Sequence, residues 1–148
     1  MRAKGFIVGL VIAAAVAAVV IAASSGSSQE EQGAESEPAR VEPIKGTDLS
    51  RVILSADAAK RLGIKTAAVT GQGSRRKVIP YDAVIYAADG TTFTYTSPKP
   101  LVFVRSPIKV RDIRGDRALL SAGPPAGTAV VTVGSQELFG TEYEVEED

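Results

Sequence analysis

The chain has 148 residues and a mass of 15.4 kDa, which leaves room for one folded domain. Its 17 basic and 17 acidic residues cancel, so the chain lacks the positive charge of a general nucleic-acid binder. Cysteine and histidine are both absent, which excludes disulfides, Cys/His metal sites and triads with an imidazole base. We therefore predict no enzymatic activity, no cofactor, no metal and no nucleic-acid partner.

Residues 1–23 form a basic start followed by an apolar run. Arg2 and Lys4 precede 18 residues, Phe6 to Ala23, without a charged or polar side chain, about the length of one bilayer crossing. We expect a retained single-pass anchor with the rest of the chain outside the cytoplasm, because the basic residues lie before the run. A cleaved signal peptide is the alternative, since Ala22-Ala23-Ser24-Ser25 offers cleavage registers.

Residues 24–50 are rich in Ser, Gly, Glu and Pro. Six acidic residues against two basic ones give this segment a net charge of −4, and such a composition favours a disordered, extended linker. We therefore expect the folded domain to cover residues 51–148.

The first part of that domain combines a short helix with strands. Residues 52–54 favour a strand, and Ser55 is a candidate N-cap for a helix over 56–62 that ends at Gly63. Residues 64–69 favour an extended segment, and residues 71–74 a flexible joint.

The remainder alternates strand and turn signals. Residues 78–86 and 91–96 flank Asp89-Gly90 and predict a hairpin. Further strands are expected over 101–104, 108–111, 117–120 and 129–133, with Arg114-Gly115-Asp116 as a tight turn and not an adhesion motif. These spacings predict a mainly β fold, a small barrel or sandwich with one short helix.

Candidate sites are few. The basic triplet Arg75-Arg76-Lys77, together with Lys109 and Arg111, is our candidate partner-binding surface, although a basic strand entrance is often only a solvated edge. The acidic end from Glu142 to Asp148 is expected to be a solvated tail. Tyr81, Tyr86, Tyr95 and Phe103 favour cross-strand packing over an aromatic ligand platform.

An ordered series of motifs resembles a known family. The series consists of Val78 to Ile85, the Asp89-Gly90 turn, Thr92 to Tyr95, the segment Phe103 to Val110, Gly115-Asp116, and the glycines Gly123, Gly127 and Gly134. This series is similar to the membrane-proximal domain of periplasmic adaptor subunits, the membrane-fusion proteins of resistance-nodulation-division efflux transporters. Ile53 to Thr66 resembles another adaptor segment.

The resemblance implies a membrane transporter as the partner. The chain resembles only part of an adaptor, however. Full adaptors carry lipoyl and helical-hairpin parts between the two resembling segments, whereas here only a short stretch that includes residues 71–77 separates them. We expect a non-catalytic, membrane-anchored accessory subunit of a transporter or efflux system. The alternative is a cell-envelope structural or ligand-binding β-module unrelated to transport.

Overall fold

The computed structural model of the chain describes residues 37–71 and 76–146, all of which belong to one compact unit. The predicted anchor, residues 24–36 of the predicted linker and Arg75 lie outside the described residues. Within the described part, no helix is long and apolar enough to cross a membrane.

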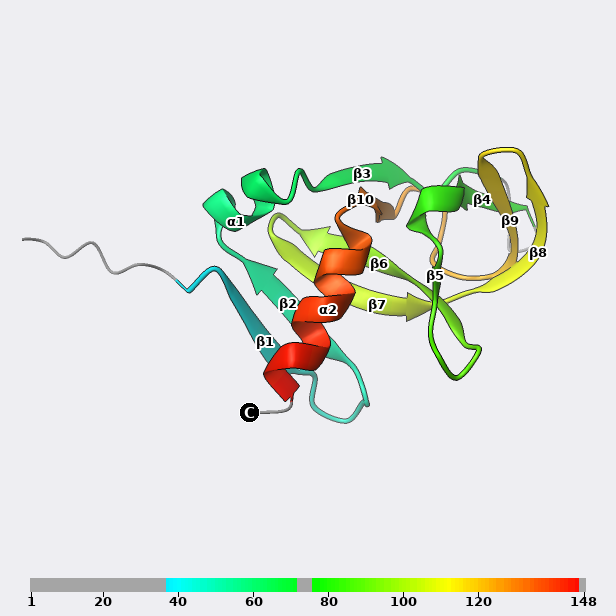
Figure 1. Cartoon of the computed structure of the whole chain (residues 1–148). Coiled ribbons are helices and arrows are strands. Elements are labelled where there is room, and N and C mark those ends of the chain that lie inside the picture. The colour runs from blue at the N-terminus through cyan, green and yellow to red at the C-terminus, as the bar shows by residue number, and fades with distance from the viewer. Residues whose placement is uncertain (1–36, 72–75, 147–148) are drawn as a thin grey trace, which may run out of the picture. The chain divides into compact units, whose positions relative to one another are not determined.

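Two antiparallel sheets make up the domain, which confirms the prediction of a mainly β fold (Figure 1). The larger sheet has seven strands, in the order β1-β2-β7-β6-β10-β3 with β5 paired to β6, and the smaller has the order β4-β9-β8. The strands are β1 Ala39–Pro43, β2 Ser50–Leu54, β3 Lys65–Ala68, β4 Lys77–Pro80, β5 Ile85–Tyr86, β6 Thr92–Lys99, β7 Val102–Pro107, β8 Lys109–Arg114, β9 Arg117–Ala122 and β10 Ala129–Val133.

The short helix α1, Ala56–Arg61, begins where the sequence predicts and ends one residue earlier, with Leu62 as its C-cap. The Ser55 side chain accepts a hydrogen bond from the Ala58 N–H at 3.1 Å, as an N-cap does. Gly63 follows the C-cap with a φ of +63°, a conformation that glycine adopts without a steric penalty.

The linker prediction is wrong for its last part, because β1 lies inside residues 24–50. Val41 pairs with Val52 of β2 and packs against the main core cluster. Ala39 and Val41 are half-buried whereas Arg40 between them is exposed, so β1 has an apolar side. The average composition of residues 24–50 does not reveal it, because charged residues surround these two. The folded domain therefore begins before residue 51.

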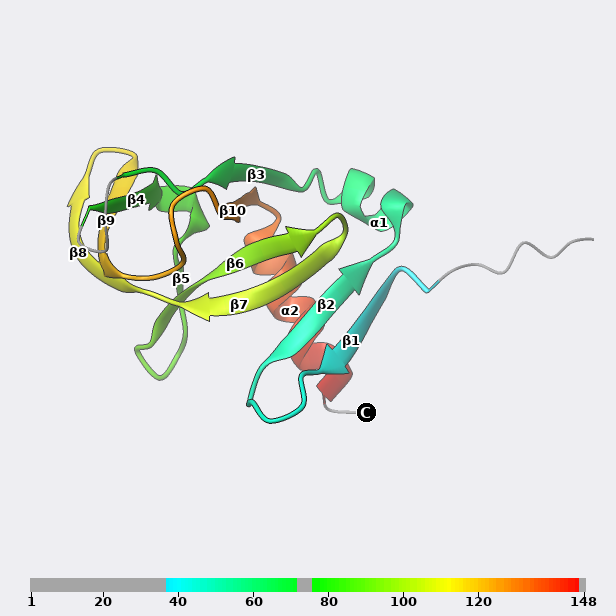
Figure 2. The same ribbon diagram turned by 180° about the vertical axis from the view of Figure 1, so that it is seen from behind.

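The prediction of a solvated acidic tail is wrong for its first part, since Ser135–Glu146 forms a second helix, α2, in which Glu142 is buried; Glu147 and Asp148 lie outside the described residues. Helix α2 crosses one face of the larger sheet in Figure 1 and lies behind the same strands in Figure 2. Leu138, fully buried, joins the main core cluster, so burial of an apolar face compensates for the modest helix propensity of Gly140 and Thr141.

The predicted strand over 78–86 is broken at Pro80. A proline has no N–H for a sheet ladder, and the next backbone donor, Tyr81 N, bonds the Asp116 carbonyl at 2.8 Å. A 3-10 turn over Tyr81–Ala83 follows, and it separates β4 in the smaller sheet from β5 in the larger one.

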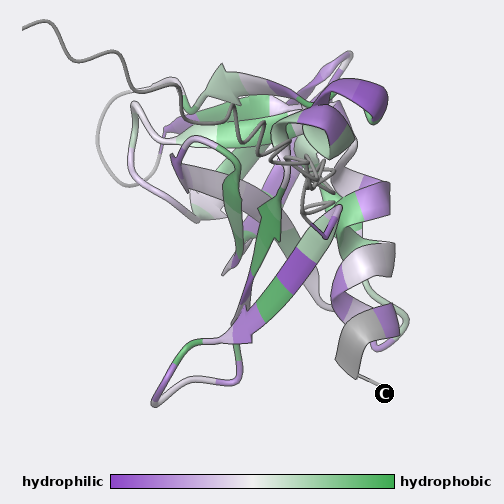
Figure 3. Cartoon of the chain, turned by 90° about the vertical axis from the view of Figure 1, so that its left-hand side faces the viewer, coloured by the Kyte–Doolittle hydropathy of each residue, from purple (hydrophilic) through white to green (hydrophobic). Residues whose placement is uncertain are grey.

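Each sheet has its own buried cluster. The larger sheet, α1 and α2 enclose one that includes Val52, Phe93 and Tyr95, and the smaller sheet packs with Val130 of β10 around Ile79 and Leu120. Figure 3 shows hydrophobic colour along the central strands and hydrophilic colour over most of α1. Burial of apolar side chains is thus the main stabilising term for both sheets.

Candidate functional site

A buried carboxylate joins α2 to the larger sheet. Glu142 is 0% exposed, and its Oε2 accepts a hydrogen bond from the Tyr95 hydroxyl. Its Oε1 accepts one from Arg105 Nε at 2.9 Å. Tyr95 and Arg105 are direct cross-strand partners in β6 and β7, so both side chains lie on the face that α2 covers.

Arg105 is held between aromatic rings. Its guanidinium carbon lies 5.6 Å from the Phe93 ring centre and 5.7 Å from the Tyr143 ring centre, within the range of cation–π attraction. The guanidinium is therefore oriented from three sides, by a carboxylate and two rings.

This environment shifts two pKa values. Burial, followed by the hydrogen bond to Glu142 and its charge, raises the pKa of Tyr95 far above its usual range, so the phenol stays protonated. Burial alone would lower the pKa of Arg105, but the negative charge of Glu142 outweighs it, with smaller contributions from the phenol groups of Tyr95 and Tyr143, and raises that pKa. Arg105 remains a cation at every physiological pH.

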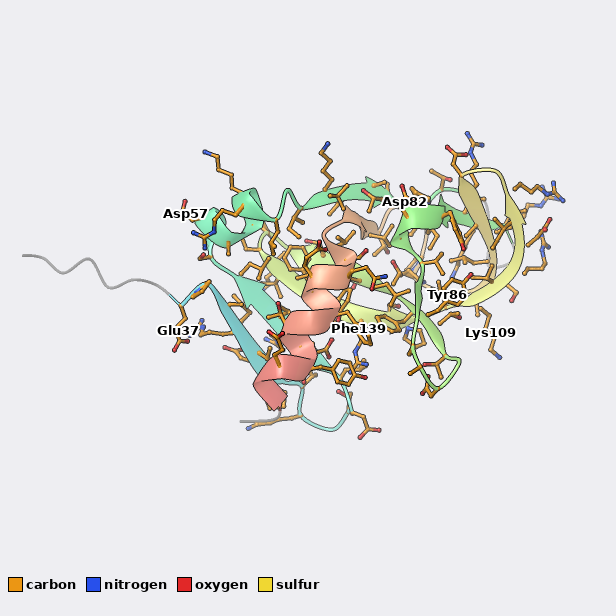
Figure 4. The ribbon with its side chains drawn as sticks, in the orientation of Figure 1. Glu37, Asp57, Asp82, Tyr86, Lys109 and Phe139 are labelled. Carbon is orange, nitrogen blue, oxygen red and sulfur yellow. The ribbon has the colours of Figure 1, made fainter. Side chains whose placement is uncertain are left out.

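A pocket of about 460 Å³ opens beside this cluster. One wall is the turn between β5 and β6, with Ala87, Asp89 and Thr91, and the other is α2, with Phe139 and Tyr143. Arg105 also lines the pocket. Figure 4 shows Phe139 on the side of α2 that faces the β5–β6 turn.

The structure separates the predicted partner-binding residues. Arg75 lies outside the described residues, and Arg76 is exposed just before β4. Lys77 is half-buried, pairs in register with the fully buried Leu120 and donates from Nζ to the Gly123 carbonyl.

Lys109 and Arg111 do lie together, on β8. Both are exposed, on either side of Val110, which packs toward the core. Arg114 and Arg117 are exposed cross-strand partners at the end of the same hairpin. We call these four residues the basic hairpin: Lys109, Arg111, Arg114 and Arg117. Asp112 and Asp116 lie between them, so residues 109–117 carry four basic against two acidic groups.

The aromatic residues divide as well. Tyr95 and Phe103 are buried core residues, which confirms the packing interpretation for them. Tyr81 and Tyr86 are 39% and 53% exposed, so they are not core residues. Partial removal of water from the phenol, then a hydrogen bond with Tyr81, raises the pKa of Tyr86.

Sequence reasoning missed the Glu142 cluster because it treated residues 142–148 as a solvated acidic end. A signal was present, since Leu138 and Glu142 are spaced i, i+4, as are Phe139 and Tyr143. That spacing places each pair on one helical face. The partners of Glu142, from strands far away in sequence, could not be inferred from it.

Among the residues that the structure describes, no group of three or more His, Cys, Asp or Glu side chains could hold a metal ion. Comparison of the chain with models of protein families, with curated proteins and with solved structures finds no match. The resemblance to adaptor subunits therefore stays a prediction that rests on the sequence motifs.

Proposed function

We propose that the chain is a non-catalytic accessory subunit of a membrane transporter. In this proposal residues 6–23 anchor it in the bilayer, and the β-domain docks on an extracytoplasmic part of the transporter. The observation that carries the docking step is the basic hairpin, whose four cations are all exposed.

The position of the basic hairpin suits a docking surface. Glu37, where the described chain begins, and Lys109 lie at opposite ends of the domain in Figure 4. The residue at which the described chain begins therefore lies away from the basic hairpin and does not cover it.

The hairpin also offers an apolar contact among its charges. Ile113 of β8 is 43% exposed and lies between Asp112 and Arg114, whose side chains form an exposed ion pair at 2.8 Å. Charges around an apolar residue steer a partner of opposite sign, and the apolar residue loses water on contact. A carboxylate-rich surface is the complementary partner.

Anchoring makes weak docking sufficient. A tether confines the domain to a thin layer above the bilayer, where its effective concentration toward another membrane protein can reach the millimolar range. The resemblance to adaptor subunits supports a transporter as that membrane protein, whereas a cell-envelope role unrelated to transport is the competing proposal.

Charge reversal tests the docking step. We expect the double variant Lys109→Glu/Arg111→Glu to reduce the amount of transporter that co-purifies with the chain at least about tenfold, because two attractive contacts become repulsive. The matched control is Lys60→Glu/Arg61→Glu on α1, which makes the same charge change on two exposed residues and should leave co-purification unchanged.

Thermal unfolding separates docking from folding in both variants. Exposed charges contribute little to stability, so both melting temperatures should stay within about 4 °C of the unaltered chain. Equal loss of transporter in the two variants, or no loss in either, would contradict docking through the basic hairpin.

A further inference from the structure

The pocket between α2 and the β5–β6 turn has the composition of a small-molecule site. Its volume, about 460 Å³, falls in the range of ligand pockets, which are mostly apolar with a few oriented polar groups. Phe139 and Tyr143 supply the apolar wall, with ring centres 4.7 Å apart. Arg105 is the cation among the lining residues.

Arg105 is unusually well positioned for a ligand. Glu142 takes Nε, one of the five N–H donors of a guanidinium, and Tyr143 also interacts with the group through a side-chain hydrogen bond. The side chain is 18% exposed, and its orientation is already fixed by Glu142 and the two rings. A ligand that accepts hydrogen bonds from this group does not have to order it first.

The cluster has a feature that stability alone does not explain. A buried ion pair is commonly no more stable than apolar residues of similar volume. Glu142 and Arg105 nevertheless form such a pair beneath an open pocket. An arginine held in place to receive a ligand accounts for both the burial of Glu142 and the opening beside Arg105.

We propose that this pocket binds a small organic carboxylate with a ring-sized apolar body. A carboxylate accepts two parallel N–H bonds from a guanidinium, and its apolar body packs on Phe139 and Tyr143. This inference does not depend on the transporter proposal.

Asp89, at the rim of the pocket, allows the sign of the ligand's charge to be tested. Its carboxylate accepts hydrogen bonds from the Thr91 N–H at 2.9 Å and the Thr91 hydroxyl at 2.7 Å. Because Asp89 is exposed, its repulsion of a bound carboxylate is screened and amounts to about a threefold effect on affinity. The same charge would strengthen binding of a cation.

The experiment uses the full chain in lipid nanodiscs, with empty nanodiscs as the blank. Three probes of similar size are titrated: 3-phenylpropionate, 3-phenylpropionamide and 3-phenylpropylamine. Amide chemical shifts of Thr91 and Gly140, which both line the pocket, report occupancy. We expect 3-phenylpropionate to bind most tightly, with a Kd of about 0.1–1 mM, the scale that ligand efficiency allows for its size.

Variants identify the contacts. Asp89→Asn should tighten 3-phenylpropionate binding about threefold, and the control Asp57→Asn, an exposed carboxylate on α1, should change nothing. Arg105→Lys keeps the charge beside Glu142 but loses the planar pair of donors, so it should weaken the carboxylate at least about fivefold. Tighter binding of the amine, weakening by Asp89→Asn, or shifts confined to residues outside the pocket would each overturn the proposal.

Discussion

The Thr94 hydroxyl is buried without a hydrogen-bond partner among the described residues. Burial of such a group is unfavourable unless water or protein satisfies it. Thr94→Val keeps the shape and removes the hydroxyl, so we expect the free energy of unfolding to rise by about 1 kcal/mol. Urea unfolding measures this, and a lower stability of Thr94→Val would show that the hydroxyl is satisfied after all.

Glu142 differs from Thr94, because each of its two buried carboxylate oxygens accepts a hydrogen bond. Glu142→Gln removes the negative charge beside Arg105 and leaves a largely buried cation without its counter-charge. We expect a loss of about 2 kcal/mol of unfolding free energy, below the value for fully buried pairs because Arg105 is 18% exposed. The control is Glu144→Gln, an exposed residue of the same helix, which should change stability very little. Equal effects would disprove the structural role of Glu142.

Asp89 has a pH dependence with a definite sign. The hydrogen bonds from the Thr91 hydroxyl and N–H hold the pKa of Asp89 below its ordinary 3.8. A carboxyl whose folded pKa is lowered contributes stability above its unfolded pKa, and this is lost as the pH falls through the folded value. Stability from Asp89 is therefore complete above about pH 4 and declines below it.

The variant Thr91→Val removes the hydroxyl but not the backbone N–H. We expect the pKa of Asp89, followed by NMR titration, to rise part of the way toward its ordinary value. The pKa of Asp112, held low by its hydrogen bond with Arg114, is the internal control and should not move. An unchanged pKa of Asp89 would contradict the hydrogen bond.

At the level of elements, β1 is part of the domain and not of the linker. The Ser55 N–H bonds the Pro38 carbonyl at 2.9 Å, and Ala39 and Val41 pack against the core. A shortened chain that begins at Asp48 loses these contacts, whereas one that begins at Glu37 keeps them. We expect the shorter chain to melt roughly 10 °C lower, for a loss of about 2 kcal/mol. Equal melting temperatures would show that β1 adds nothing to the fold.

Local signals predicted local structure well. Ser55 caps α1 as its position in the sequence indicates, and Gly90 and Gly115, with φ values of +83° and +59°, form the predicted hairpin turns. Long-range partners were not predictable in this way. Nothing near Pro80 shows that β4 joins a different sheet from β5, and nothing near Glu142 identifies Tyr95 and Arg105, because those contacts depend on packing between distant segments.

The candidate sites likewise divide into those that local sequence signals predict and those that depend on contacts between distant segments. The cations of β8 could be predicted because an exposed strand face alternates with a buried one, as Lys109, Val110 and Arg111 do. The sequence alone could not show that Lys77 is half-buried, because this depends on its register with Leu120. The pocket could not be predicted either, because its two walls meet only in the fold.

For the whole molecule, the proposed function depends most on what lies at the two opposite ends of the domain. The described chain begins at Glu37, at the end of the domain opposite to Lys109 (Figure 4). A tethered domain with this arrangement should contact its partner through the basic hairpin and not through α1.

Site-specific photo-crosslinking in intact cells tests this claim most directly. A photoreactive residue replaces Ile113, which is exposed at the centre of the basic hairpin, and Lys60 on α1 serves as the matched position. We predict a crosslink from position 113 to one integral membrane transport protein, identified by mass spectrometry, and none from position 60. Crosslinks from position 113 only to envelope polymer or lipid, or equal crosslinks from both positions, would contradict the account.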